Sequence, residues 1–446
     1  MKIKPHELSA TEASAFIASG QLKSVQLVQS CLDRIDQTDG DIKAWAYLDA
    51  DKAMEQAAAL DRRRQAGFAT GPLHGLPVAL KDIIDTRDMP TERGTPIFAG
   101  RQSEDDARVV EMLREAGAVI MGKTVTTEMA FVHANETRNP HNPDRTPGGS
   151  SSGSAAAVAA GHVPLAIGTQ TNGSVIRPAS FCGTFGFKPT RGMIPRTGVL
   201  QTSKSLDQIG TFARTLEDAA LLADAISGYD QRDAVSYEFA RPSALEGARE
   251  DVPVEPALAW FNLPFNDRLS EAASEGLESV MDVLGAHVTR MDAANQLGEL
   301  VAVQARIHEY EIARHQAAVF DGHWDQVSET LKPIIERARQ ISEGEYQDAL
   351  AVKASAESFF AEFFQDYDAI LAPSAAGEAV PFGTNTGDPI FCTLWTLAGL
   401  PCVTLPLLVG ETGLPIGVQL IGPAHKDDRL LRTARWCQNH IAAEAA

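Results

Sequence analysis

The sequence predicts an α/β sandwich in one large domain. Segments with strand and helix periodicity alternate from about residue 75 to near the end of the chain, a pattern typical of helices packed on a sheet. The length of 446 residues would allow two or three domains, but no Pro/Ser-rich linker or low-complexity stretch divides the chain. We therefore expect one domain over residues 1–446.

Four segments are expected within this domain. They are an N-terminal helical segment (1–65), a central segment of strands and helices (75–225), a variable, partly helical cover (226–360) and a return to the sheet (361–446). The first helix opens at a capping box formed by Ser9 and Glu12, and helical periodicity continues to about Arg64.

The central and C-terminal elements follow from periodicity and turn residues. Leu76–Leu80 is an apolar run that predicts a buried strand ending at Lys81. The other predicted strands are 118–121, 163–167, 257–261, 286–289 and 369–371, and the other predicted helices are 103–116, 152–160, one with Leu277, Val280, Met281 and Leu284 on its apolar face, and most of 300–364.

Composition narrows the functional classes. The formal net charge of -20 disfavours direct binding to nucleic acid or an anionic membrane, and no apolar run is long enough to cross a bilayer. Five cysteines are widely spaced and form no metal motif. With no signal-peptide pattern at the N-terminus, we expect a cytoplasmic protein that needs neither metal nor cofactor.

Two glycine-rich turns and one lysine carry the catalytic prediction. Ser150 and Ser174 lie 24 residues apart, within Gly148–Ser154 and Gly168–Ser174. A serine hydroxyl needs an adjacent base, and a lysine is a base only where burial favours its neutral form. Lys81, at the end of the predicted buried strand, meets that condition. The turn around Ser174 could direct backbone N–H groups at a tetrahedral oxyanion, with donors from Thr171, Asn172, Gly173 and Ser174.

These residues resemble the amidase signature family, and the resemblance covers nearly the whole chain. It includes the motifs Gly75-Leu76-Pro77, Gly122-Lys123-Thr124, Phe187-Lys188-Pro189-Thr190, Leu371-Ala372-Pro373 and Gly413-Leu414-Pro415-Ile416-Gly417-Val418-Gln419. The resemblance implies a large, mixed, twisted sheet flanked by helices on both faces. It also implies that Ser174 is the acyl nucleophile and that Lys81 is the ultimate base. Ser150, which would follow a cis peptide, would pass the proton from Ser174 to Lys81.

Three features bear on the substrate. Gln170 stands where the family usually has aspartate, and Asn172 replaces the first glycine of a pair. Asparagine tolerates left-handed backbone conformations, and its side chain would narrow the site. Arg177, three residues after Ser174, has the spacing that resembles malonamidases, which implies that its guanidinium receives a substrate carboxylate. The alternative is that Arg177 only ties loops together. We name Arg177, Gly149 and Gln170 as substrate-binding residues.

Other patterns are given structural interpretations. Gly117–Thr124 matches a phosphate-binding loop, but the expected helix and strand lie in the wrong order. Gly149–Gly153 matches Gly-x-Ser-x-Gly, which would make Ser151 a nucleophile, yet a proline-rich loop precedes it. Lys123 and Lys188 are assigned to surface or loop-anchoring roles. Asp82 could orient Lys81 or only cap a turn, and we favour the first role.

Residues of the helical cover have two possible roles. His308, Tyr310, His315, Trp324, Phe359 and Phe360 could line a substrate pocket, but aromatic residues at helical spacing are more often core, which we favour.

The leading interpretation is a stand-alone amidase, a homodimer, that hydrolyses a small-molecule carboxamide through an acyl-enzyme on Ser174. One alternative is the amide-cleaving subunit of a glutamine-dependent tRNA amidotransferase. Another is a non-catalytic amidase-like binding protein.

Overall fold

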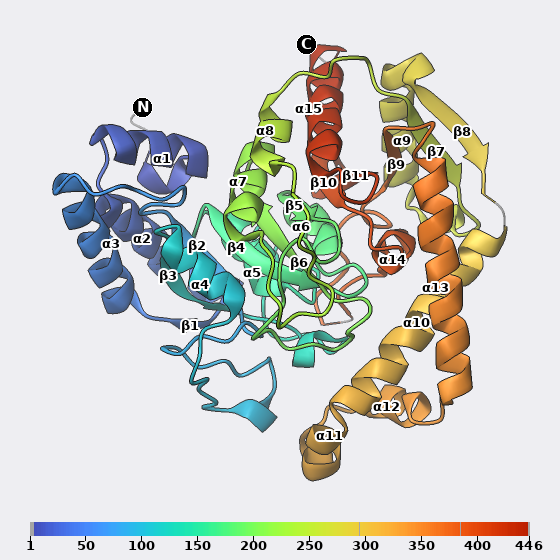
Figure 1. Ribbon diagram of the computed structural model, residues 1–446, viewed down its shortest axis with the longest axis horizontal. Coiled ribbons are helices and arrows are strands. Elements are labelled where there is room, and N and C mark those ends of the chain that lie inside the picture. The colour runs from blue at the N-terminus through green and yellow to red at the C-terminus, as the bar shows by residue number, and fades with distance from the viewer. Residues whose placement is uncertain (1–3, 294, 384, 445–446) are drawn as a thin grey trace.

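The computed structural model describes residues 4–293, 295–383 and 385–444, and its framework is one mixed sheet (Figure 1). The strands are β1 (Trp45–Leu48), β2 (Pro77–Lys81), β3 (Val119–Thr124), β4 (Leu165–Gln170), β5 (Phe185–Lys188), β6 (Gln208–Ala213), β7 (Leu258–Asn262), β8 (Val288–Asp292), β9 (Ala369–Pro373), β10 (Cys402–Val409) and β11 (Pro415–Ile421). Their order is β1-β3-β2-β4-β6-β5-β10-β11-β9-β7-β8. Each of the four predicted segments contributes at least one strand.

The sheet contains two parallel groups of three strands, β3-β2-β4 and β9-β7-β8, and its other neighbouring strands pair antiparallel, including the edge strand β1 with β3. β2 pairs in parallel with β3 and β4, and β7 pairs in parallel with β8 and β9. The strands between β4 and β9 pair antiparallel. Every residue of β2, β3, β4, β5, β6 and β9 is buried, as expected for strands covered on both faces. The predicted mixed sheet is confirmed.

Helices cover both faces of this sheet. They are α1 (Ala10–Ser19), α2 (Ser24–Ile42), α3 (Ala50–Gln65), α4 (Arg108–Glu115), α5 (Ser152–Ala159), α6 (Ile176–Cys182), α7 (Leu216–Ile226), α8 (Ala244–Arg249), α9 (Glu271–Leu284), α10 (Asn295–His315), α11 (Ala317–His323), α12 (Lys332–Ala338), α13 (Glu343–Phe363), α14 (Ile390–Leu397) and α15 (Asp427–Glu444). A Cβ on Gly210 of β6 would meet Val175 beside α6, whereas the hydroxyl of the next residue, Thr211, donates to Ala219 O in α7. Because successive strand residues point to opposite faces, α6 and α7 lie on opposite sides of the sheet.

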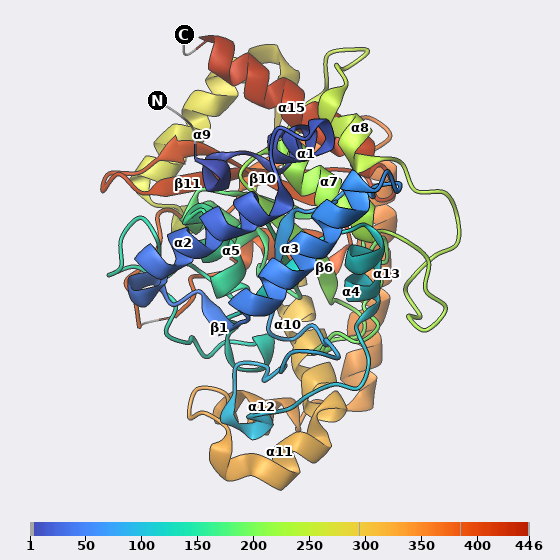
Figure 2. The ribbon, with the colours of Figure 1, turned by 90° about the vertical axis from the view of Figure 1, so that its left-hand side faces the viewer.

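The N-terminal segment differs from the continuous helical pattern expected up to Arg64. α2 ends at Ile42, the C-cap residue Lys43 has a φ of 57°, and β1 then pairs antiparallel with β3 before α3 begins. α2 and α3 lie side by side across the face seen in Figure 2. β1 has only four residues, which is too short for periodicity to separate it from the flanking helices.

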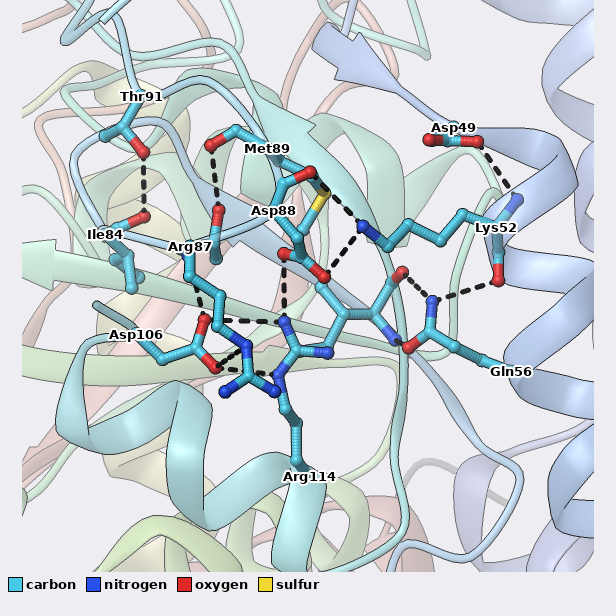
Figure 3. Close-up of polar contacts among 12 residues, drawn as sticks. Asp49, Lys52, Gln56, Ile84, Arg87, Asp88, Met89, Thr91, Asp106 and Arg114 are labelled. Atoms are coloured by element: carbon cyan, nitrogen blue, oxygen red, sulfur yellow. Dashed lines mark hydrogen bonds and ion pairs between the residues drawn. The ribbon is translucent and has the colours of Figure 1, made fainter. Parts of the chain in front are cut away.

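A network of ion pairs fixes the loop that follows β2 (Figure 3). Asp88 in this loop accepts from Lys52 Nζ of α3 and from Arg114 Nη2 of α4, both at 2.9 Å. Arg114 Nε also donates to Asp106, at 2.9 Å. The loop after β2 is thereby tied to α3 and α4.

The cover is mainly helical, as expected. α10 and α13 pack side by side along one side of the molecule, with α11 and α12 at one end of the pair (Figure 1). α10 also packs against α14. Several boundaries differ from the sequence expectation: α4 begins at Arg108 rather than 103, β3 continues to Thr124, and β4 begins at Leu165 and continues to Gln170.

Candidate active site

Lys81 ends β2 with its side chain fully buried. Its Nζ donates to Ser150 Oγ at 2.7 Å and to Thr169 Oγ1 at 2.8 Å. Burial lowers the pKa of Lys81 well below its usual value, and the negative charge of the buried Asp207 opposes that effect. A lysine whose neutral form is favoured can accept a proton from the hydroxyl that it contacts.

Ser150 lies just before α5, and the Gly149–Ser150 peptide is cis. Ser150 O accepts from Thr127 N at 3.2 Å and Thr126 Oγ1 at 3.1 Å. A Cβ on Gly149 would lie 2.7 Å from Thr386 Cγ2. Glycine is therefore required at this position by close packing.

Ser174 lies in the loop between β4 and α6 and is partly exposed. Its Oγ makes no hydrogen bond within the part of the chain that the structure describes, so the Lys81–Ser150 contact is formed while a Ser150–Ser174 hydrogen bond is not. Catalytic hydrogen bonds are often formed only when substrate is bound.

The backbone donors around Ser174 fall into two groups. Val175 N and Ile176 N donate to Gln170 Oε1, at 2.8 and 3.0 Å. In contrast, the N–H groups of Asn172, Gly173 and Ser174 donate to no other described residue. Asn172 does not have the positive φ that its residue type would tolerate. Three consecutive N–H groups are left for a ligand.

A pocket of about 250 Å³ opens beside Ser174. The loop between β4 and α6, residues 171–175, is called the nucleophile loop. The residues lining the pocket come from the loop 130–132, the nucleophile loop, α6, α10, α12 and the segment before α14: Ala130, Phe131, Val132, Thr171, Asn172, Gly173, Ser174, Arg177, Gln304, Ala305, His308, Glu309, Ile334, Asn385, Thr386, Gly387 and Pro389. His308 therefore lines the pocket, and its burial lowers its pKa to about 4. Phe360 is buried in the core as expected.

Arg177 is buried in the wall of this pocket with its donors only partly used. Nη2 donates to Gly149 O at 2.7 Å and to Thr386 Oγ1 at 3.1 Å. Nε and Nη1 are buried without a hydrogen-bond partner among the described residues. Burial lowers the pKa of Arg177 to about 10, so the guanidinium remains charged at neutral pH. The side chain ties two loops together and also retains free donors.

Two of the predicted roles need correction. The Gln170 amide is fully engaged, because Nε2 donates to Thr396 Oγ1 at 2.9 Å while Oε1 accepts from Val175 and Ile176. It supports the loop instead of facing the pocket. Asp82 accepts from Glu92 N at 3.1 Å and makes no hydrogen bond to Lys81 among the described residues. Its burial raises its pKa to about 6.

The surface or loop-anchoring roles expected of Lys123 and Lys188 are also incorrect in part. Both residues lie within strands and are fully buried. Lys123 Nζ donates to Ile84 O and Thr91 Oγ1, and Lys188 Nζ donates to Gln208 Oε1. What distinguishes Lys81 is its contact with Ser150, and not its burial.

The two rejected motifs have structural roles. β3 begins at Val119, two residues after Gly117, so most of Gly117–Thr124 is a strand and not a phosphate-binding loop. Ser151 Oγ donates to Thr169 O at 3.2 Å and accepts from Thr169 N at 3.2 Å. Its hydroxyl is therefore occupied in joining α5 to β4.

Sequence reasoning missed the residues that support the nucleophile loop from elsewhere in the fold. Asp207, which is buried, accepts from Thr171 Oγ1, Thr202 N and Ser203 N. Gln304 and Thr396 contact the loop from α10 and α14. No spacing in the sequence joins these positions, because only the folded chain brings them to residues 171 and 172.

Comparison with known proteins identifies the family. The family model described as Amidase matches residues 26–431. The chain belongs to the amidase family. It is an amidase signature hydrolase, so the expectation of an amidohydrolase is confirmed.

Related proteins match over nearly the whole chain. One, from Thermobifida fusca, is named as a subunit of glutamyl-tRNA(Gln) amidotransferase and is 36% identical over 95% of this chain and 93% of its own length. The protein of the same name from Chloroflexus aurantiacus is 35% identical over 96% and 95%.

Solved structures confirm the fold. One is described as an unexpected vestigial protein complex that reveals the evolutionary origins of an s-triazine catabolic enzyme. It aligns with a TM-score of 0.92 and 28% identity over 97% of this chain and 98% of that one. A structure described as an amidase aligns with a TM-score of 0.86 and 29% identity over 97% and 99%.

These comparisons correct the expected partners. We expected a small-molecule amide substrate, a homodimer and no nucleic acid, but the relatives above are named as one component of an amidotransferase for glutamyl-tRNA(Gln). That expectation is therefore wrong. The closer resemblance to malonamidases stays a prediction. Among the described residues, no helix is long and apolar enough to span a membrane.

Proposed function

We propose that this chain is the amide-hydrolysing subunit of a glutamine-dependent tRNA amidotransferase. The observation that carries the proposal is the 35–36% identity to glutamyl-tRNA(Gln) amidotransferase subunits over at least 93% of both chains. The contact of a buried lysine with Ser150 beside the Ser174 loop supports it, because that arrangement suits amide cleavage. The amide donor would be the side-chain carboxamide of glutamine.

Ser174 Oγ attacks the carboxamide carbon in the first step. Its proton passes to Ser150 Oγ as the Ser150 proton passes to neutral Lys81, and a C–O bond forms as the carbonyl becomes an oxyanion. The N–H groups of Asn172, Gly173 and Ser174 are the donors free to bind that oxyanion.

Collapse of the tetrahedral intermediate breaks the C–N bond. The proton held by Lys81 returns through Ser150 to the leaving nitrogen, and ammonia departs. Water then attacks the acyl-enzyme, giving its proton to the same relay, and releases glutamate with Ser174 regenerated. The burial of Lys81 supports this cycle, because the amine must be neutral at the start of acylation and again at the start of deacylation.

Arg177 is assigned to the substrate carboxylate. Its Nε and Nη1 are charged, buried and without partners among the described residues, and the side chain lines the pocket beside Ser174. Unused buried donors carry a desolvation cost that a bound carboxylate would remove. The α-carboxylate of glutamine supplies such a group.

The amidotransferase role implies partner subunits. The formal net charge of -20 favours association with a basic partner, and cytoplasmic tRNA would be the acceptor. Ammonia released at Ser174 would pass to the partner that activates glutamyl-tRNA.

The test is expression of the tagged chain in its native host, followed by purification with whatever proteins accompany it. Ammonia release from glutamine and amide transfer to glutamyl-tRNA(Gln) would be measured for wild type and Ser174→Ala. We expect Ser174-dependent glutamine hydrolysis that co-purified subunits and glutamyl-tRNA(Gln) stimulate. Efficient hydrolysis of other amides by the isolated chain, with no stimulation by either addition, would overturn the proposal.

A further inference from the structure

Three consecutive backbone carbonyls of the nucleophile loop are held by hydrogen bonds. Thr171 O accepts from Gln304 Nε2 of α10 at 2.9 Å. Asn172 O accepts from Thr396 Oγ1 of α14 at 2.6 Å. Gly173 O accepts from Arg177 N in α6 at 3.0 Å. The first two bonds come from helices more than 100 residues away in sequence.

Each fixed carbonyl sets the direction of the next N–H group. In a trans peptide the C=O and the following N–H lie in one plane and point in opposite directions, and the only cis peptide among the described residues is Gly149–Ser150. The carbonyls of residues 171, 172 and 173 therefore orient the N–H groups of residues 172, 173 and 174. These are the same three N–H groups that are free beside Ser174 in the described part of the chain.

The side chain of Asn172 joins the two supporting helices. Its Nδ2 donates to Gln304 Oε1 at 3.2 Å, and its Oδ1 accepts from Thr393 Oγ1 of α14 at 2.7 Å. Gln304 is thus bound to the loop through both ends of its amide. Thr396 also accepts from Gln170 Nε2 at 2.9 Å. Gln170 and Asn172, the two departures from the family motif, both bond to α14.

We propose that Gln304 and Thr396 are positioning residues that aim the oxyanion donors by holding the carbonyls of Thr171 and Asn172. Asn172 locks the arrangement by bridging α10 to α14. This inference rests on the proposed acyl-enzyme at Ser174, and it assigns a catalytic consequence to contacts made by the helical cover. Because Gln304 is buried, its amide has little access to water as an alternative hydrogen-bond partner.

The test uses variants that delete one hydrogen bond with little change in shape. Thr396→Val removes the hydroxyl, and Thr396→Ser retains it. Gln304→Met removes the amide. Tyr346→Phe is the matched control, because Tyr346 OH donates to Glu311 Oε1, also on α10, at 2.6 Å but does not contact the loop. Thermal unfolding of each variant would identify any that fails to fold.

Two measurements distinguish an effect on the orientation of the oxyanion donors from a general effect on the stability of the fold. One is the burst of p-nitrophenol from p-nitrophenyl acetate, which reports acylation without requiring the natural substrate. The other is inhibition by butylboronic acid, whose tetrahedral serine adduct resembles the transition state. Because outright loss of one oxyanion donor costs about 10²–10³ in kcat, we expect misaimed donors to slow acylation by about 10–100-fold in Thr396→Val and Gln304→Met, with boronate affinity falling in parallel.

The outcomes are distinguishable. Near-wild-type acylation in Thr396→Ser and Tyr346→Phe, together with the losses above, would support the inference. Wild-type acylation and boronate affinity in folded Thr396→Val and Gln304→Met would overturn it while leaving the proposed function in place. A wild-type protein without a Ser174-dependent burst would overturn the proposed mechanism, and the inference with it.

Discussion

Replacement of Lys81 by methionine should alter the pH dependence of stability in a way that reports the charge of the buried amine. Lys81 is fully buried, and burial lowers its pKa well below the usual value. In the unfolded chain the same amine returns to a pKa of about 10.4. Between these two values, unfolding of the wild type takes up a proton that unfolding of Lys81→Met does not.

The magnitude follows from one proton. When the unfolded state binds more protons, the free energy of unfolding rises with pH, by up to about 1.36 kcal/mol per pH unit for a single group. The free energy of unfolding of the wild type should therefore rise, relative to that of Lys81→Met, by up to about 2.7 kcal/mol between about pH 7.5 and pH 9.5. The rise ends as the pH passes the pKa of the amine in the unfolded chain. Other groups titrate alike in both proteins and cancel in the difference.

The assay is urea unfolding of both proteins at half-unit steps across this range. Steady-state kinetics provide the second arm, since loss of a general base lowers kcat by about 10²–10⁴. Parallel stability profiles for the two proteins would contradict the prediction that buried Lys81 is neutral, because they would mean that folded Lys81 keeps its proton. In that case it could not act as the base without a further change on substrate binding.

Three further variants test other parts of the account. Ser150→Ala should lower kcat by about 10²–10⁴ with an unchanged circular dichroism spectrum, and near-normal turnover would exclude the relay. Arg177→Leu should raise KM for glutamine by about 10-fold or more, because a charged hydrogen bond contributes about 1.5–3 kcal/mol; equal losses on an amide without a carboxylate would show a purely structural role. Asp233→Ala should lower the free energy of unfolding by about 3–5 kcal/mol, since it strands the buried Arg196 at the other end of a 2.8 Å ion pair. The exposed Glu136→Gln is its control, where a change above about 1 kcal/mol would argue against the burial explanation.

The sequence predicts the elements of the fold well where their patterns are long or their caps distinct. The apolar run before Lys81, the helix after Ser152 and the helical face containing Leu277 are all present as expected. β1 is missed because four residues give little periodicity. The extension of β3 to Thr124 is missed because Gly122 and Lys123 resemble the start of a loop.

Sequence reasoning correctly predicted that Lys81 is buried, but it failed to predict the burial of two other lysines. A lysine in a strand is ordinarily exposed, yet Lys123 and Lys188 are buried as Lys81 is. Each is accommodated by oxygen acceptors from distant parts of the chain, such as Ile84 O for Lys123 and Gln208 Oε1 for Lys188. These acceptors are defined only by the folded sheet.

Roles that depend on long-range contacts were likewise outside the reach of sequence. Gln170 was predicted to bind substrate, but its amide bonds to Thr396 and to the backbone N–H groups of Val175 and Ile176 at the start of α6. Asp82 follows Lys81 in sequence, yet its carboxylate accepts a hydrogen bond from Glu92 N. Adjacency along the chain does not fix side-chain direction at the end of a strand, where successive residues point to opposite faces.

The central claim is that Ser174 carries the acyl group of glutamine during turnover, and the most direct measurement is peptide mass spectrometry of the purified complex after acid quenching in the presence of glutamine. The account predicts one glutamyl group on the peptide that contains Ser174, with none on the same peptide from Ser174→Ala. Sustained glutamine hydrolysis by Ser174→Ala, or a glutamyl group on another residue of the wild type, would contradict it.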